Sequence, residues 1–217
     1  LLHLCRLGIP TGLQMSMITL GGMVLQSVLN GFGVVFVAGY TAANKLYGIL
    51  ESASVAFGYA MTAYMGQNRG ARNAARIDAG IRAVLVLSAE FTAAIVTAML
   101  LAGKPLLGLF LSTEEAGAAD ALAVAYQYLM VLMAFLFALF MLQAYRSSLQ
   151  GLGEMTVPTL SGFAEMLMRM GAALVLPTFI GQSGVFFAEG AAWVCAAALN
   201  LVWYYMRIGK IKREMMQ

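Results

Sequence analysis

Charged residues are scarce in this chain: Asp, Glu, Lys and Arg make up only 11% of its 217 residues. A soluble globular domain carries about 25% charged residues. Hydrophobic residues account for 61% of the sequence instead, and its mean hydropathy is +0.82. This balance excludes an ordinary soluble domain or a soluble helical core, and it indicates an integral membrane protein.

Residue types that commonly carry catalysis or bind metals are also rare. The chain has one histidine, His3, and two cysteines, Cys5 and Cys195, whose positions do not match a disulfide framework or a metal site. It contains no His-Glu-x-x-His pair, no Walker loop and no Gly-x-Ser-x-Gly elbow. The sequence therefore predicts a protein that is not an enzyme and that binds no cofactor, so any transport energy would come from an ion gradient or from a partner.

Long apolar runs are what the sequence does have. A helix needs roughly 20 residues to cross a hydrocarbon core of about 30 Å. Six runs approach or exceed this length, and they are Ile9–Leu29, Val34–Met65, Ile81–Leu101, Ala121–Leu142, Val157–Ile180 and Val185–Met206. No linker divides them, so the sequence predicts an all-α integral membrane fold in which residues 1–217 form a single six-helix lobe.

Lysine and arginine collect at one set of helix ends, which predicts the orientation of the chain. If the first helix runs outward, only Lys104 lies on the outer side, together with the acidic residues Glu114, Glu115 and Asp120. The basic residues of the inner side are Arg6, Arg69, Arg72, Arg76, Arg82, Arg146, Arg207, Lys210, Lys212 and Arg213. We therefore expect a multi-pass protein of the cell membrane with cytoplasmic basic loops and C-terminal tail. The net charge of +3 reflects this topology and not a nucleic-acid interface.

Polar side chains line one face of each of the first two predicted helices, because residues three and four apart share a face. On the second helix these are Asn44, Tyr47, Glu51, Ser54, Gly58 and Thr62, and on the first they are Met15, Thr19, Gly22, Gln26 and Asn30. The two faces predict a shared cavity. The alternative is interhelical hydrogen bonding that only holds the bundle together.

Glu51 is the central candidate of that cavity, because an ionisable residue inside a membrane needs a partner, a cavity or a function. Its carboxylate could exchange a proton, or bind Na⁺ with neighbouring oxygen atoms. The predicted ion-coupling and substrate cavity consists of Glu51, Asn44, Tyr47, Ser54, Gln26 and Asn30.

Three further acids, Glu90, Glu165 and Glu189, lie in the predicted spans. Glu165 and Arg169 are four residues apart in the favourable order for an ion pair on one helix. We interpret them mainly as a structural pair, with a role in coupling as the alternative. Glu189 is expected at the membrane interface.

Several motifs occur in one order along the chain. They are Gly8-Ile9-Pro10, Leu13-Gln14, Asn30-Gly31-Phe32-Gly33, Ile49-Leu50-Glu51, Gly66-Gln67-Asn68-Arg69-Gly70-Ala71 with Arg76, Arg146, Leu149-Gln150-Gly151, Gly153 with Pro158, and Gly162 with Glu165 and Arg169. This series resembles the second half of the multidrug and toxic compound extrusion (MATE) family over nearly the whole chain. The Gly66–Ala71 block is its most specific part.

The resemblance implies a twelve-helix transporter of two pseudo-symmetric lobes that works by alternating access. This chain would be the C-terminal lobe, and the N-terminal lobe would belong to the same polypeptide or to a separate chain. Family members export organic cations and drugs in exchange for Na⁺ or H⁺.

The chain also departs from the family pattern. Some members place acids on the first and fourth helices of this lobe, where this sequence has Gln14, Gln26 and Asn30, and then Gln143. Glu51 is the remaining candidate acid in this lobe, unless the N-terminal lobe carries the coupling. Two other functions stay open: a flippase for lipid-linked sugars from the wider superfamily, and a non-transporting six-helix scaffold subunit.

Overall fold

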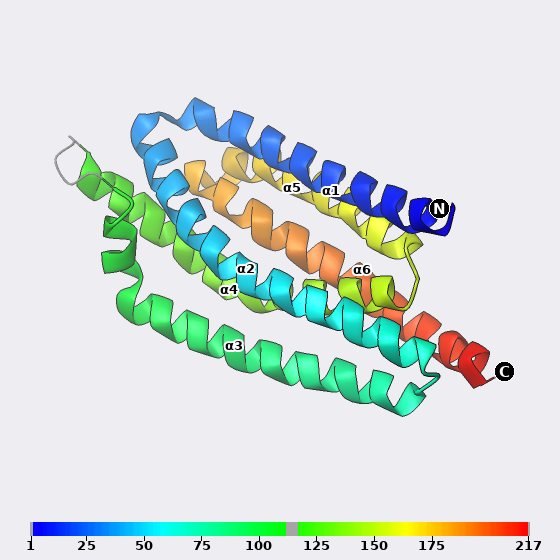
Figure 1. Cartoon of the computed structure of the whole chain (residues 1–217). Coiled ribbons are helices and arrows are strands. Elements are labelled where there is room, and N and C mark those ends of the chain that lie inside the picture. Colours follow the sequence, from blue (N-terminus) through cyan, green and yellow to red (C-terminus); the bar gives the residue numbers. More distant parts are fainter. Residues whose placement is uncertain (1, 112–116, 217) are drawn as a thin grey trace.

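The computed structural model describes residues 2–111 and 117–216, with side chains from Gly8 to Met215 in these ranges. Six long helices follow one another in the predicted order, with two short 3-10 turns between them (Figure 1). The elements are α1 (Leu2–Leu29), η1 (Asn30–Phe32), α2 (Val34–Gly70), α3 (Ala74–Gly108), α4 (Ala118–Gly151), α5 (Thr156–Ile180), η2 (Gln182–Phe186) and α6 (Phe187–Met216). The predicted all-helical fold is confirmed, and every helix extends beyond its predicted segment at one end or both. Glu114 and Glu115 lie outside the described residues.

Five of the helical segments are long and apolar enough to cross a membrane. They are Gly8–Phe32, Ala74–Gly108, Ala118–Gly151, Thr156–Ile180 and Gln182–Met215. α2 has 37 residues and is long enough, but the polar side chains along it lower its hydropathy. Five of the six predicted spans are thus supported, and a crossing by α2 stays a prediction.

α4 lies at the centre of the bundle. It packs against α2, α3 and α6, while α5 packs against α1 and α6. Both chain ends lie at one end of the bundle, together with the α2–α3 and α4–α5 turns (Figure 1). The fold therefore gathers at one end the turns and the tail to which the sequence assigned the basic residues.

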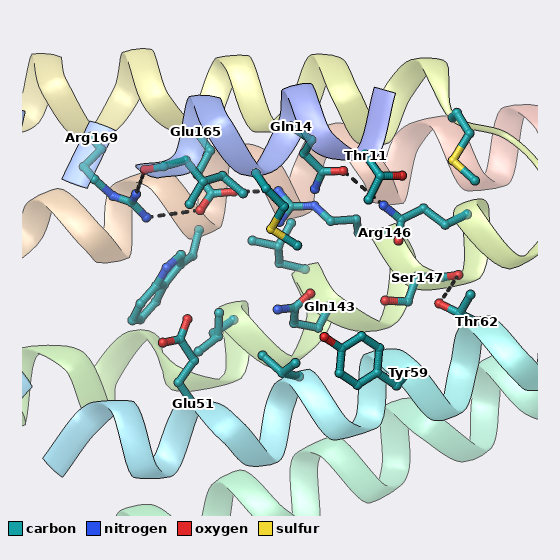
Figure 2. Close-up of a pocket in the computed structure, with 18 residues that line it drawn as sticks. Thr11, Gln14, Glu51, Tyr59, Thr62, Gln143, Arg146, Ser147, Glu165 and Arg169 are labelled. Carbon is teal, nitrogen blue, oxygen red and sulfur yellow. Dashed lines mark hydrogen bonds and ion pairs between the residues drawn. The ribbon is translucent and has the colours of Figure 1, made fainter. Parts of the chain in front are cut away.

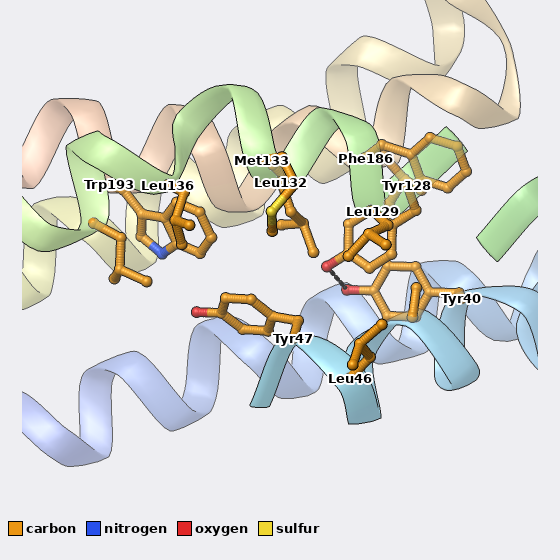
Figure 3. Close-up of a cluster of buried hydrophobic side chains, with 14 of the residues drawn as sticks. Tyr40, Leu46, Tyr47, Tyr128, Leu129, Leu132, Met133, Leu136, Phe186 and Trp193 are labelled. Carbon is orange, nitrogen blue, oxygen red and sulfur yellow. Dashed lines mark hydrogen bonds between the residues drawn. The ribbon is translucent and has the colours of Figure 1, made fainter. Parts of the chain in front are cut away.

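Aromatic side chains fill the contact between α2, α4 and α6 (Figure 3). The rings of Tyr40 and Tyr128 stack with their centroids 4.3 Å apart, and the Tyr128 hydroxyl donates to the Tyr40 hydroxyl at 3.0 Å. Tyr47 stacks on Trp193 with a centroid distance of 5.5 Å. These contacts fix the rotation of α2 about its axis, so the residue one turn after Tyr47 faces the interior of the bundle.

The basic turn between α2 and α3 contacts the turn between α4 and α5 at the same end of the bundle. α2 continues to Gly70, beyond its predicted end. The Asn73 side chain caps α3 by accepting a hydrogen bond from the backbone N–H of Arg76 at 3.0 Å. Arg69 donates to the carbonyl oxygen of Leu152, between α4 and α5. The most family-specific block therefore has a structural task, which is to hold these two turns together.

Glycines let α2 and α4 approach closely. A Cβ atom on Gly39 would lie 2.3 Å from the carbonyl oxygen of Ala121, and one on Gly151 would lie 2.4 Å from the carbonyl oxygen of Thr62. Both obstacles are backbone atoms, which cannot move aside as a flexible side chain can. The helix spacing along this contact therefore requires glycine.

We expect Gly39→Ala to lower the free energy of unfolding by about 1–3 kcal/mol, the usual cost of overpacking a core. Gly48→Ala is the matched control on the same helix, because a Cβ atom there meets nothing within 4 Å. Thermal unfolding of the intact protein in detergent measures both. Equal melting temperatures for the two variants would contradict this packing of α2 on α4.

Candidate functional site

A cavity of about 410 Å³ lies between α1, α2, α4, α5 and α6 (Figure 2). Its volume falls in the range of sites that hold drug-sized molecules. The polar and aromatic residues that line it are Thr11, Gln14, Glu51, Tyr59, Thr62, Gln143, Arg146, Ser147, Gln150, Glu165, Arg169 and Trp193. Amide, hydroxyl, carboxylate and guanidinium groups therefore converge on one space inside an otherwise apolar bundle.

Glu51 faces this cavity from α2 and is half-buried. The hydroxyl of Tyr47, one helical turn earlier, interacts with its carboxylate. Within the described part of the chain, Glu51 forms no ion pair. Figure 2 shows it on the opposite wall from Glu165 and Arg169. Glu51 thus presents an uncompensated negative charge when it is ionised.

The opposite wall is a network of buried ion pairs centred on Glu165. One carboxylate oxygen of Glu165 lies 2.5 Å from Nη2 of Arg146 on α4, and the other lies 3.1 Å from Nη2 of Arg169, one turn along α5. The same nitrogen of Arg169 lies 2.8 Å from a carboxylate oxygen of Glu189 on α6. Two arginines and two glutamates sum to zero charge, which is how buried ions are tolerated in a membrane.

Polar contacts also tie α1 to this wall. Arg169 donates from Nη1 to the carbonyl oxygen of Ile18 at 3.0 Å, and the Gln150 amide donates to the Gln14 side-chain oxygen at 3.0 Å. A Cβ atom on Gly162 of α5 would lie 2.6 Å from the Gln14 side chain. α1 therefore lies directly on α5, and one side of the cavity is formed by Thr11, Gln14, Met15 and Ile18 of α1.

Comparison with known proteins identifies the architecture. A family model described as MatE matches residues 10–175. The chain belongs to the MATE family. It is 29% identical over 214 residues to YpnP of Bacillus subtilis (strain 168), a probable multidrug resistance protein, with 95% of this chain and 45% of YpnP covered. The chain spans about half the length of the curated relatives that it matches.

Solved MATE structures have the same fold. A crystal structure of MATE in complex with MaL6 matches with a TM-score of 0.87 at 21% identity, covering 97% of this chain and 47% of that one. An outward-facing multidrug resistance MATE family transporter of the MOP superfamily matches with a TM-score of 0.85 at 21% identity, covering 96% and 47%. Together with the apolar helices, family membership makes the chain part of a multi-pass membrane protein.

The predicted site residues of this MATE chain, which are the predicted cavity set and the predicted Glu165–Arg169 pair, fall into two groups. Glu51, Glu165 and Arg169 line the cavity. Tyr47 does not line the cavity itself. It contacts Glu51 and Trp193, and both of these residues line the cavity. These four residues form one continuous region around the cavity.

The other predicted residues lie elsewhere. Ser54 is fully buried, and its hydroxyl donates to the backbone carbonyl of Glu51 at 2.8 Å, which is a contact within the helix. Asn44 is exposed on α2 and does not line the cavity. Gln26 and Asn30 are exposed near the end of α1 and are hydrogen bonded to each other at 3.1 Å. The shared face of α1 and α2 is thus only partly the face of this cavity.

Two charged residues have different surroundings from those that the sequence predicted. Arg146 was assigned to a cytoplasmic loop, but α4 continues through it to Gly151, and it is only 5% exposed. Glu189 was expected at the interface, but it pairs with Arg169. The sequence did indicate a longer helix here, because the residues next to Arg146 on both sides are uncharged and can extend α4 beyond the apolar run.

We expect Glu165→Gln to lower the free energy of unfolding by about 3–5 kcal/mol, because it leaves Arg146 buried without its carboxylate partner. Thermal unfolding of the intact protein measures the loss. Glu214→Gln is the control, since its pair with Lys210 is exposed and spans 3.9 Å, and such a pair contributes about 1 kcal/mol or less. A Glu165→Gln variant as stable as the control would show that the network does not hold the bundle.

Proposed function

We propose that this chain is the C-terminal lobe of a secondary active antiporter, which exports organic cations or drugs in exchange for Na⁺ or H⁺. The observation that carries the proposal is the carboxylate of Glu51, which lies on the wall of a drug-sized cavity and has no ion-pair partner among the described residues. Membership of the MATE family and the similarity to a probable multidrug resistance protein support it.

The charges around the cavity favour a cationic cargo. The pairs of Arg146 and Arg169 with Glu165 and Glu189 balance, so an ionised Glu51 leaves a net charge of −1. An organic cation, Na⁺ or a proton can each neutralise that charge, and only one of them can do so at a time. Competition for one carboxylate gives exchange, because arrival of the ion weakens the binding of the drug.

The proposed partner is a second, N-terminal lobe, which would close the cavity from the other side. The chain accounts for 45–47% of the length of the MATE proteins described above. Alternating access would then require the two lobes to rock relative to each other, so that the cavity opens to each side of the membrane in turn.

The other candidate functions have less support. A flippase for lipid-linked sugars, which carry phosphate, would be served by a cavity with excess positive charge, whereas the charges here sum to −1. A scaffold without transport would pack its polar side chains against neighbouring helices, whereas Glu51 faces open space.

Glu51→Gln is expected to reduce gradient-driven transport to the level of empty vesicles, because the amide is nearly the same size and cannot exchange a proton or neutralise a cation. The measurement is the flux of a fluorescent organic cation into or out of proteoliposomes that contain the intact protein, under an imposed Na⁺ or proton gradient. The gradient that drives the unmodified protein identifies the coupling ion.

Glu90→Gln is the matched control, since Glu90 lies exposed on α3 and does not line the cavity. It should retain the flux. Full flux from Glu51→Gln, in protein that unfolds at the unmodified temperature, would rule out Glu51 as the coupling site.

We further propose that the basic end of the bundle faces the cytoplasm. Arg146 is buried in the bundle, so it no longer counts as a loop residue. Nine basic residues of the predicted inner set remain, against Lys104 alone on the predicted outer side, so the excess of positive charge at this end is kept. In a cysteine-free form of the intact protein, Gly31→Cys should react with an impermeant maleimide on whole cells. Ala71→Cys should react only after the cells are opened. The reverse pattern would invert the topology.

A further inference from the structure

A second cavity, of about 530 Å³, lies between α2 and α3. Its lining includes Ala56, Ala60 and Tyr64 from α2, and Gly80, Ala83 and Leu87 from α3. At 100° per residue, Ala60 lies about 180° from Glu51 on α2, so this cavity is on the far side of α2 from the central one. We call it the α2–α3 groove.

The groove has a buried floor and an open rim. Met61, Gly80 and Val84 are buried, whereas Ala60 and Ala83 are exposed. Small side chains on both helices leave a channel that the chain's own side chains do not fill. In a membrane-spanning bundle, such an apolar channel must be covered by lipid or by another helix.

A positive charge marks one end of this groove. Arg76 lies one turn before Gly80 on the same face of α3, and its carbonyl oxygen accepts a hydrogen bond from the hydroxyl of groove-lining Tyr64 at 3.0 Å. Its side chain is exposed and forms no ion pair with any described residue. The nearby acid, Asp78, is bonded to Lys212 of α6 instead.

The length of the groove suits a lipid chain that starts at this charge. Eleven residues separate Arg76 from Leu87, which corresponds to about 16 Å along the helix. Arg72, in the turn before α3, is exposed and adds a second positive charge at the same end. A phosphodiester would supply an anion that matches these exposed guanidinium groups, which an apolar covering helix would not.

We propose that the α2–α3 groove binds an anionic phospholipid. One acyl chain lies against Ala60 and Ala83, and the phosphate contacts Arg76. The apolar wall supplies the affinity for any lipid chain, and the arginine selects a headgroup with net negative charge. The site is spatially separate from the site of the proposed exchange at Glu51, because it lies on the opposite face of α2.

Native mass spectrometry of the intact protein in detergent tests the headgroup. Dioleoyl phosphatidylglycerol should be retained more strongly than dioleoyl phosphatidylcholine, and Arg76→Gln should weaken phosphatidylglycerol binding about fivefold, the effect of one surface arginine. Arg82→Gln removes the same charge from another face of α3 and should leave binding unchanged. Equal retention of the two lipids, or equal losses in the two variants, would overturn the proposal.

A second pair of variants tests the acyl chain. Ala83→Leu fills the groove and should reduce the binding of both lipids, whereas Ala89→Leu adds the same side chain on the opposite, exposed face of α3. Both variants must unfold at the unmodified temperature. Unchanged lipid binding in Ala83→Leu would show that protein and not lipid covers the groove, and the proposal would fail.

Discussion

The cavity depends on one carboxylate, that of Glu165, which holds two buried guanidinium groups on its two oxygen atoms. Through Arg146 it fixes α4 to α5, and through Arg169 it reaches Glu189 on α6 and the Ile18 carbonyl on α1. Ions removed from water are tolerated only when their partners are in place. Four helices must therefore adopt one relative arrangement for these charges to be satisfied, and this arrangement forms one wall of the cavity.

The two walls of the cavity consequently differ in how their charges are compensated. On the α5 side every charge is compensated, so an arriving cation would have to displace an existing pair. On the α2 side Glu51 has no ionic partner in the described chain, and the Tyr47 hydroxyl interacts with its carboxylate. Reversible exchange needs a site that can be occupied and vacated at low cost. In the proposed exchange, an ion or a drug could therefore occupy Glu51 without breaking an existing ion pair of the opposite wall.

The features that the sequence predicted are those that depend on one helix at a time. Apolar run length set the number and order of the helices, and spacing along α5 placed Glu165 beside Arg169. Spacing along α2 also put Glu51 and Tyr47 on an inner face. Pairings between helices were not predictable in this way. Arg146 meets an acid 19 residues away on another helix, and a helical wheel says which residues share a face but not what lies opposite. For the same reason it could not separate Glu51, at the cavity, from Ser54, which is fully buried and hydrogen bonded within α2.

α2 separates the central cavity from the α2–α3 groove, so the position of this helix bears on the width of both. Val55 and Tyr59 line the central cavity, whereas Ala56 and Ala60, one residue later in each case, line the groove. Glycine contacts hold α2 close to α4, and closely packed helices transmit a displacement to their neighbours. A movement of α2 that widens the cavity around Glu51 must then alter the width of the groove between α2 and α3. The proposed lipid would resist or favour the movement according to which groove width it fills better. The two faces of one helix would then couple the membrane to the cavity without any contact between the lipid and the proposed substrate.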